Sequence, residues 1–199
     1  MNRFLYDRVI EWIPPASRVL DLGTGDGGFL ERLIQTKRVH GEGVERDPEM
    51  VMRCIERGLE VHQGDILDGL DQYGANTFDF VMILGTFQEL FSPRDVLHEA
   101  FRVGSNVIIA YMNFAYWRFR SQMLIKGKTP RMQSSALPWY ESPNVQFFSI
   151  FDFYEFCEAT GIRIKQAAYF SPRTEISVLP NFRAEQALAL IGPNGSKSD

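Results

Sequence analysis

The chain has 199 residues, a length that fits one domain with a hydrophobic core of its own. Its 45% hydrophobic and 23% charged residues are usual for a globular protein, and a net charge of -4 argues against binding to a nucleic-acid duplex, which requires a basic face. Without a signal peptide, an apolar run of roughly 20 residues or a CxxC pair, it is expected to be cytoplasmic, with no membrane contact and no metal site.

Apolar residues at helical spacing predict a first helix over residues 4–13, which Pro14 and Pro15 end. Asp47 and Ser92 each precede a proline and are expected to cap the helices that follow them. In chain order, the remaining predicted elements are strand 18–22, helix 29–36, strand 41–45, helix 48–57, strand 60–63, strand 78–84, a helix opening at 92–95, strand 107–110, helix 149–160, strand 162–170 and strand 183–191.

Strand and helix alternate along most of the chain, and two strands come late. Alternation of this kind predicts an α/β, Rossmann-like fold: a mostly parallel seven-stranded sheet with helices on both faces and an antiparallel edge hairpin. We expect a single domain over residues 1–192 and a polar, mobile tail over 193–199. Residues 112–148 lack clear periodicity and exceed an ordinary loop, which indicates a lid-like insertion.

The strongest motif is a glycine-rich turn between the first strand and the next helix. Gly23, Gly25 and Gly28 satisfy GxGxxG with Thr24 inside it, and Asp21 lies two residues before the first glycine. The pattern favours a loop that lets a nucleotide-type cofactor approach the backbone over a plain glycine turn. Carboxylates at Asp21 and Asp26 would repel a pyrophosphate but suit a sulfonium and an ammonium, so S-adenosylmethionine is favoured over NAD.

Further cofactor residues are expected where other strands end. Glu45 ends the second strand and is predicted to accept hydrogen bonds from the ribose hydroxyls. Asp65 and Ile66 follow the third strand and are predicted to contact adenine, although a turn aspartate is a common alternative. Leu84, Gly85 and Thr86 lie at the end of the fourth strand and should line the same pocket, because ligands of such sheets bind outside the carboxyl ends of the strands.

These motifs resemble the class I methyltransferase pattern, and further blocks are similar to the methionine biosynthesis protein W (MetW) family. The blocks that carry the resemblance are Arg18–Gly23, Arg57-Gly58, Phe78–Val81, Arg102–Gly104, Asn113-Phe114 with Trp117-Arg118, Trp139-Tyr140 with Ser142–Asn144, and Asp152-Phe153 with Cys157. Two positions depart from the family pattern: Thr24 replaces a cysteine, and Leu84-Gly85 replaces polar residues. The resemblance implies a link to methionine biosynthesis and a homoserine O-acyltransferase partner.

The segment after the fifth strand holds the candidates for contact with a methyl acceptor. Tyr111, Asn113 and Tyr116 leave the carboxyl edge of the sheet there and are candidate catalytic residues; the alternative is a packed lid with its aromatic rings in a small core. The basic run 118–131 has three interpretations: a solvated helix, a surface for an acidic partner, or, least favoured, an RNA contact. We expect a partner or substrate surface in this region.

Two functions are compatible with these features. The first is methyl transfer from S-adenosylmethionine to a small molecule, with S-adenosylhomocysteine as product. The second is a non-catalytic accessory or regulatory subunit of a homoserine O-acyltransferase. The absence of an evident catalytic base and the altered end of the fourth strand favour the second somewhat.

Overall fold

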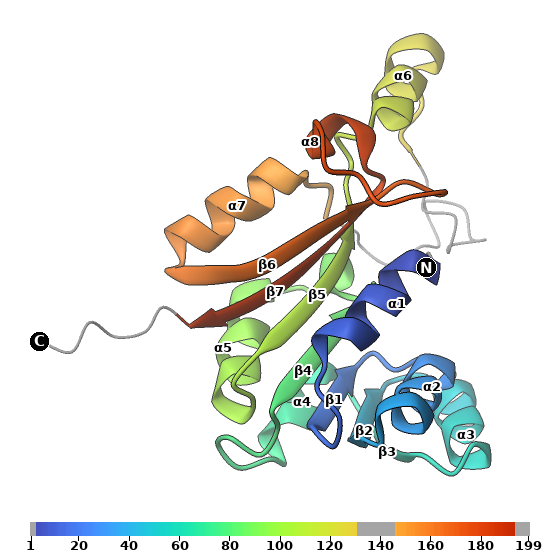
Figure 1. The fold of residues 1–199 in the computed structure, drawn as a ribbon, viewed down its shortest axis with the longest axis vertical. Coiled ribbons are helices and arrows are strands. Elements are labelled where there is room, and N and C mark those ends of the chain that lie inside the picture. The colour runs from blue at the N-terminus through green and yellow to red at the C-terminus, as the bar shows by residue number, and fades with distance from the viewer. Residues whose placement is uncertain (1–2, 131–145, 194–199) are drawn as a thin grey trace, which may run out of the picture.

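The computed structural model describes residues 3–130 and 146–193 (Figure 1). In chain order the elements are α1 (Arg3–Trp12), β1 (Arg18–Leu22), α2 (Gly28–Lys37), β2 (His40–Glu45), α3 (Pro48–Glu56), β3 (Glu60–Gln63), α4 (Ile66–Asp71), β4 (Phe80–Leu84), the 3-10 turn η1 (Phe87–Glu89), α5 (Pro93–Val103), β5 (Val107–Met112), α6 (Trp117–Lys126), α7 (Ile150–Ala159), β6 (Ile162–Phe170), α8 (Pro180–Arg183) and β7 (Gln186–Pro193).

The strands form one seven-stranded sheet in the order β3-β2-β1-β4-β5-β7-β6. The pairs among β1 to β5 are parallel, whereas β7 runs antiparallel to both β5 and β6. The predicted Rossmann-like fold with a late antiparallel pair is therefore confirmed. In that pair β6 forms the edge of the sheet and β7 lies between β5 and β6. Because β7 is antiparallel to both neighbours, it is the one strand that runs opposite to the others.

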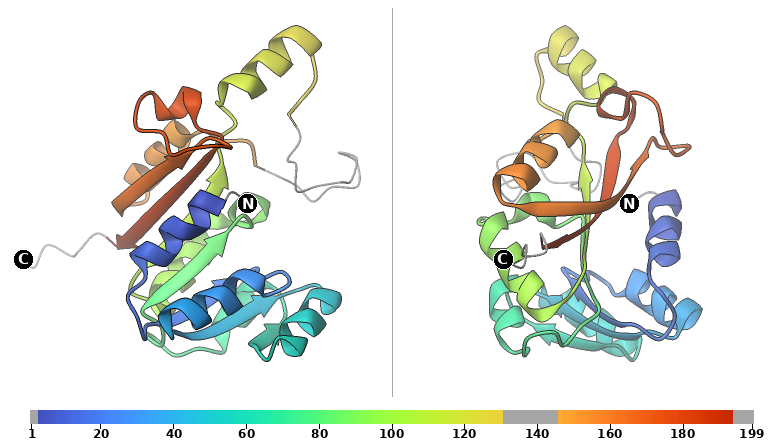
Figure 2. Two further views of the ribbon diagram at one scale, coloured as in Figure 1. Left: turned by 45° about the vertical axis from the view of Figure 1, so that its right-hand side comes forward. Right: turned by 60° about the vertical axis from the view of Figure 1, so that its left-hand side comes forward.

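Helices cover both faces of the sheet (Figure 2). The pleat sends alternate residues of β1 to opposite faces: Leu20 and Leu22 pack with α4, α5 and α7, whereas Val19 packs with α1 and α2. Both β1 and β4 are buried along almost their whole length, as expected for parallel strands covered on both sides. Asp21 therefore points to the same face as Val19, toward α1 and α2.

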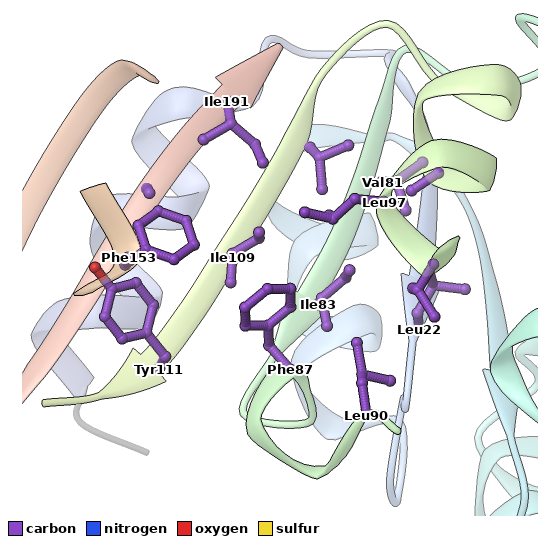
Figure 3. Close-up of a cluster of buried hydrophobic side chains, with 14 of the residues drawn as sticks. Leu22, Val81, Ile83, Phe87, Leu90, Leu97, Ile109, Tyr111, Phe153 and Ile191 are labelled. Carbon is purple, nitrogen blue, oxygen red and sulfur yellow. The ribbon is translucent and has the colours of Figure 1, made fainter. Parts of the chain in front are cut away.

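Aromatic side chains dominate the larger core at the carboxyl ends of β4 and β5. In Figure 3 Phe87, Tyr111 and Phe153 lie beside one another between these strands and α7, with Ile83 and Ile109 next to them. The ring centroids of Tyr111 and Phe153 are 4.7 Å apart, and those of Phe87 and Phe153 are 6.0 Å apart. This packing joins the end of the parallel sheet to the late part of the chain.

Two local expectations need correction, at α4 and at the start of the last strand. A helix, α4, begins directly after Asp65, where no element is predicted. The ten-residue α6 lies inside the segment 112–148 and none of its residues is buried, which agrees with the solvated helix that was one of the three interpretations of residues 118–131. Residue 183 belongs to α8, which begins at a proline, and the last strand starts only at Gln186.

The two expected helix caps behave differently. The Asp47 carboxylate accepts a hydrogen bond from the Glu49 N–H at 2.8 Å, so this cap is confirmed. Ser92 precedes α5, but its hydroxyl is bonded to the Asp95 carboxylate and makes no bond to the helix backbone. Two expectations fall partly outside the described residues. These are the lid-like insertion over 112–148, of which 131–145 are not described, and the mobile tail over 193–199, of which 194–199 are not described.

Candidate cofactor site

The glycine-rich loop between β1 and α2 lies tightly against β2 and the end of β4. The N–H groups of Gly23 and Thr24 both donate to the Val44 carbonyl, at 2.8 and 3.2 Å. Gly23 has a φ of +80°, and a Cβ atom there would collide with the Thr86 side chain. Only glycine combines this conformation with this close approach. These contacts hold the loop in one conformation at the carboxyl ends of β1, β2 and β4.

Thr24 supports this loop from within. Its hydroxyl donates to the Asp21 carbonyl at 2.8 Å, and its side chain packs against the backbone of Gly43. The side chain is thus turned into the protein, and any contact between Thr24 and a ligand would come from its backbone.

Glu45, at the end of β2, is fixed by three backbone donors. Its carboxylate accepts from the N–H of Gly25 at 2.8 Å, of Arg46 at 2.8 Å and of Asp47 at 2.9 Å. The first bond joins the predicted ribose acceptor directly to the glycine loop. A carboxylate offers about four lone-pair positions, so part of its accepting capacity is unused.

Asp21 is an isolated buried acid. Only 4% of the residue is exposed, and within residues 3–130 and 146–193 its carboxylate forms no hydrogen bond or ion pair. Burial and the nearby Glu45 carboxylate raise the pKa of Asp21 to about 7. Tyr6 on α1 lies close enough that the charge of Asp21, after burial itself, raises the pKa of its phenol. The raised pKa means that the ionised form of Asp21 is costly in this environment, and a cation placed beside it would lower that cost.

A cavity of about 410 Å³ opens beside the loop at the carboxyl ends of the strands. This volume lies within the range of roughly 300–1,000 Å³ that is usual for small-molecule sites. Four of the predicted cofactor residues line it: Gly23, Glu45, Asp65 and Ile66. The cavity also borders Thr86, which was expected to line it with Leu84 and Gly85. Its other lining residues are not predicted from the sequence: Val44, Arg46, Gly64, Leu67, Glu89, Leu90, Phe91, Ser92 and Val96.

The missed residues come mainly from the turn after β4. Glu89 is half-buried, and its pKa is raised by burial and by Glu45 against the opposing effect of Arg46. Phe91 stands at the rim with 99% of its surface exposed. Buried Gln88 bonds to both the N–H and the carbonyl of Met112, at 2.8 and 3.1 Å, which ties this turn to β5. The sequence Phe87–Leu90 holds two adjacent polar residues, Gln88 and Glu89, and no pattern in it indicates that Gln88 is the buried one.

The other predicted cofactor residues do not line this cavity: Asp21, Thr24, Gly25, Gly28, Leu84 and Gly85. Gly25 and Gly28 belong to the loop beside it, and Leu84 packs on the core under α1 and α2. Gly85 has a φ of +93° where the chain leaves β4. Asp65 has a second role, because its carboxylate accepts from the Leu67 N–H at 3.2 Å as the N-cap of α4.

The three candidate catalytic residues are all buried away from the cavity. Tyr111 lies in the aromatic core, and burial there raises the pKa of its phenol well above 10. Asn113 is fully buried; its amide donates to the carbonyls of Asn181 and Ala184, and its oxygen accepts from the Ala115 and Ile150 N–H groups. Tyr116 packs against Trp117 and Phe119. The structure favours the packed alternative for this segment, and we assign these residues no chemical step.

The described part of the basic run forms α6, which projects from the body of the molecule (Figures 1 and 2). Arg120 lies 5.8 Å from the ring of Phe182 on α8, which marks the base of the projection. Arg131 lies outside the described residues.

Within the described parts of the chain, no group of three or more His, Cys, Asp or Glu side chains is arranged to hold a metal ion. No described helix is both long and apolar enough to cross a membrane.

Known structures share this architecture. A methyltransferase from Archaeoglobus fulgidus, described as dependent on S-adenosylmethionine (SAM), matches with a TM-score of 0.67 at 18% identity, covering 94% of this chain and 90% of that one. The magnesium protoporphyrin IX methyltransferase of Synechocystis, solved with bound S-adenosylhomocysteine (SAH), matches with a TM-score of 0.66 at 14% identity, covering 94% and 81%. The fold is that of the class I SAM-dependent methyltransferases.

The family model of the methionine biosynthesis protein MetW matches residues 3–191, so the chain belongs to the MetW family. The bifunctional methionine biosynthesis protein MetXA/MetW of Rhodopirellula baltica is 29% identical over 195 residues, which cover 92% of this chain. The chain spans 31% of the length of that relative. The expected connection with methionine biosynthesis is thereby confirmed at the level of the family.

Proposed function

We propose that the chain binds S-adenosylmethionine across the carboxyl ends of β1 to β4. The observation that carries this proposal is Asp21, a buried acid before the glycine loop whose carboxylate bonds to no side chain or backbone group of residues 3–130 and 146–193. The ammonium and sulfonium of the cofactor supply the positive charge that this acid lacks. Dinucleotides are disfavoured, because the Asp21 carboxylate would lie near their pyrophosphate at the glycine loop, whereas Glu45 suits the ribose of either ligand.

The adenosyl end suits the cavity beside the loop. Glu45 would accept from the ribose hydroxyls with the capacity that its three backbone bonds leave free. Asp65 would accept from the adenine amino group, while Ile66 would pack on the ring. The backbone of Gly23, Thr24, Gly25 and Gly28 would border the methionyl part, and Leu84 and Gly85 would flank it.

When bound, the cofactor supplies an electrophilic methyl group, and we propose a small molecule as its acceptor. The contribution of this chain is then orientation, since an aligned nucleophile needs little acid–base assistance. Asp21 would hold the charged end in place, and the buried turn around Gln88 would keep the wall of the cavity rigid.

Titration calorimetry with S-adenosylmethionine, S-adenosylhomocysteine and NADH tests this proposal. We expect both adenosyl ligands to bind and NADH to bind far more weakly. Absence of heat with either adenosyl ligand at millimolar concentration, or a clear preference for NADH, would contradict it.

A specific observation also favours the second function, an accessory subunit of a homoserine O-acyltransferase. The Rhodopirellula relative is described as a single MetXA/MetW protein, of which this chain spans under a third. Segments that work together are often joined in one chain, where their effective concentration is high. We propose that this chain meets an acyltransferase partner through a non-covalent surface.

We assign that surface to α6. Leu124 and Ile125 are 88% and 78% exposed, and Arg118 and Lys126 add positive charge around them. The ten-residue α6 has no buried residue, so packing against the rest of this chain stabilises it little. Isolated helices of this length are only marginally stable, and a partner surface would stabilise this one. We expect α6 to bind in an apolar groove of the acyltransferase that is edged by carboxylates.

Capture of the purified homoserine O-acyltransferase of the same organism on the immobilised chain tests this assignment. We expect the double change Leu124→Ser and Ile125→Ser to reduce capture at least tenfold, as loss of central apolar anchors does. The matched control is Met52→Ser with Ile55→Ser, since these side chains on α3 are also more than half exposed. No capture by the wild-type chain would contradict the accessory function, and equal capture by both variants would contradict the choice of α6.

A further inference from the structure

Arg57 connects the end of α3 to the glycine loop. It is the C-terminal cap residue of this helix, and its guanidinium makes three separate contacts. Nε donates to the Asp26 carbonyl at 2.8 Å, one terminal nitrogen contacts the Asp26 carboxylate at 3.2 Å, and the other contacts the Glu31 carboxylate on α2 at 2.7 Å. The fork geometry of arginine allows all of these contacts together.

The bond to the Asp26 carbonyl is the informative one, because it holds the backbone of the loop as well as a side chain. Two other residues of the same segment support it. The Cys54 thiol lies 3.2 Å from the Gly25 carbonyl, and Leu59 and Cys54 pack so closely on Gly27 that a Cβ atom there would collide with them. The outer side of the loop is thus held by the segment from α3 to β3.

The inner side of the loop faces the proposed ligand. There the Gly25 N–H donates to Glu45 at 2.8 Å, while the Asp26 carboxylate is turned outward to Arg57. Asp26 therefore does not add its charge to the site in the way its place in the motif suggests. Asp21 and Glu45 provide the acidity that faces the ligand.

We propose that Arg57 is a positioning residue: it holds the loop from outside so that the Gly25 amide and the Glu45 carboxylate keep the arrangement that receives an adenosyl ligand. This inference rests on the proposed cofactor function. It assigns to Arg57 a role in ligand affinity through the backbone of residues 25 and 26, without contact between Arg57 and the ligand.

Calorimetric titration of the full chain with S-adenosylmethionine and with S-adenosylhomocysteine tests the role. We expect Arg57→Gln to weaken both by about tenfold, since bonds from a charged donor to the loop are lost. The ratio of the two affinities should stay unchanged, because a displaced loop affects both ligands equally. Arg57→Lys should give an intermediate loss, and circular dichroism should show each variant folded at the temperature of the titration.

Arg53→Gln is the matched control, because Arg53 lies one turn earlier on α3, is exposed, and forms no side-chain hydrogen bond or ion pair within the described residues. Unchanged affinities in Arg57→Gln would overturn the inference. So would a gain for S-adenosylmethionine alone, which is the signature of a lost repulsive charge, or an equal loss in Arg53→Gln. A wild-type chain that binds neither ligand would overturn the cofactor function itself.

Discussion

At the residue scale, acidity in the site depends on what each carboxylate faces. Asp26 is paired with Arg57, Glu45 is surrounded by backbone N–H groups, and Asp21 has no partner in the described structure. Carboxylates that look equivalent in the motif thus have different surroundings. Burial and the nearby Glu45 carboxylate raise the pKa of Asp21 to about 7.

This difference predicts that Asp21→Asn stabilises the unliganded protein. The pKa of Asp21 in the folded chain is above its ordinary value, so ionising this acid costs more in the folded chain than in the unfolded one. Asp21 therefore costs no stability below about pH 4, and its contribution lowers the free energy of unfolding as the pH rises toward 7. The neutral amide avoids this loss, so the free energy of unfolding at pH 8 should increase by about 2–4 kcal/mol. Urea unfolding at pH 4 and pH 8 measures the change, and an equal effect at both values would contradict the argument.

The same substitution should weaken binding of S-adenosylmethionine and remove its pH dependence. In the wild type, affinity should increase between about pH 6 and 8, because the ionised acid attracts the cationic ligand. Calorimetry across this range in both proteins tests the link. A flat wild-type profile would show that Asp21 does not face the ligand charge.

Glu45→Ala should reduce cofactor affinity by roughly 1.5–3 kcal/mol, since hydrogen bonds to a charged group are lost. Part of the loss comes from the loop, because the Gly25 N–H loses its acceptor. Glu45→Gln keeps one carbonyl acceptor and should lose less. Equal affinities of wild type and Glu45→Ala by calorimetry would refute the ribose assignment.

At the element scale, α7 illustrates stabilisation by local sequence apart from the site. Ser149 and Asp152 form a capping box: the Ser149 hydroxyl accepts from the Asp152 N–H, and the Asp152 carboxylate accepts from the Ser149 N–H. Ser149→Ala should lower the free energy of unfolding by about 1 kcal/mol. Because α7 contributes no residue to the cavity lining, ligand affinity at 25 °C should be unchanged, and a matching loss of affinity would connect α7 to the site.

At the scale of the whole molecule, the cavity draws its lining from β2, the segment after β3 and the turn after β4. A ligand there joins segments distant in sequence and should stabilise the folded chain. At one hundred times its Kd, S-adenosylhomocysteine should add about 2.7 kcal/mol. Thermal unfolding of a chain of this size should then show a rise of roughly 5–10 °C in Tm. Unchanged Tm at this saturation would contradict binding to the native state.

The sequence by itself determined the order of the main strands and helices and the mostly parallel sheet. It also indicated that the glycine loop and Glu45 lie at the same edge of that sheet. These depend on local patterns: apolar periodicity, glycines at Gly23 and Gly25, and the fact that parallel strands end at one edge. The short α4 was not predicted, because a six-residue helix gives too little pattern. For the exposed α6 a solvated helix was one of three interpretations, because a helix without a buried face has no apolar periodicity to favour it over the others.

Only the tertiary structure decided what each side chain faces. It turned the Thr24 hydroxyl inward, neutralised Asp26 with an arginine 31 residues away, and buried Tyr111 and Asn113 where a sequence pattern suggests a substrate surface. The physical reason is that burial and charge pairing depend on contacts between distant segments. Residue type and spacing cannot show which carboxylate lacks a partner, and that property makes Asp21 the centre of the proposed site.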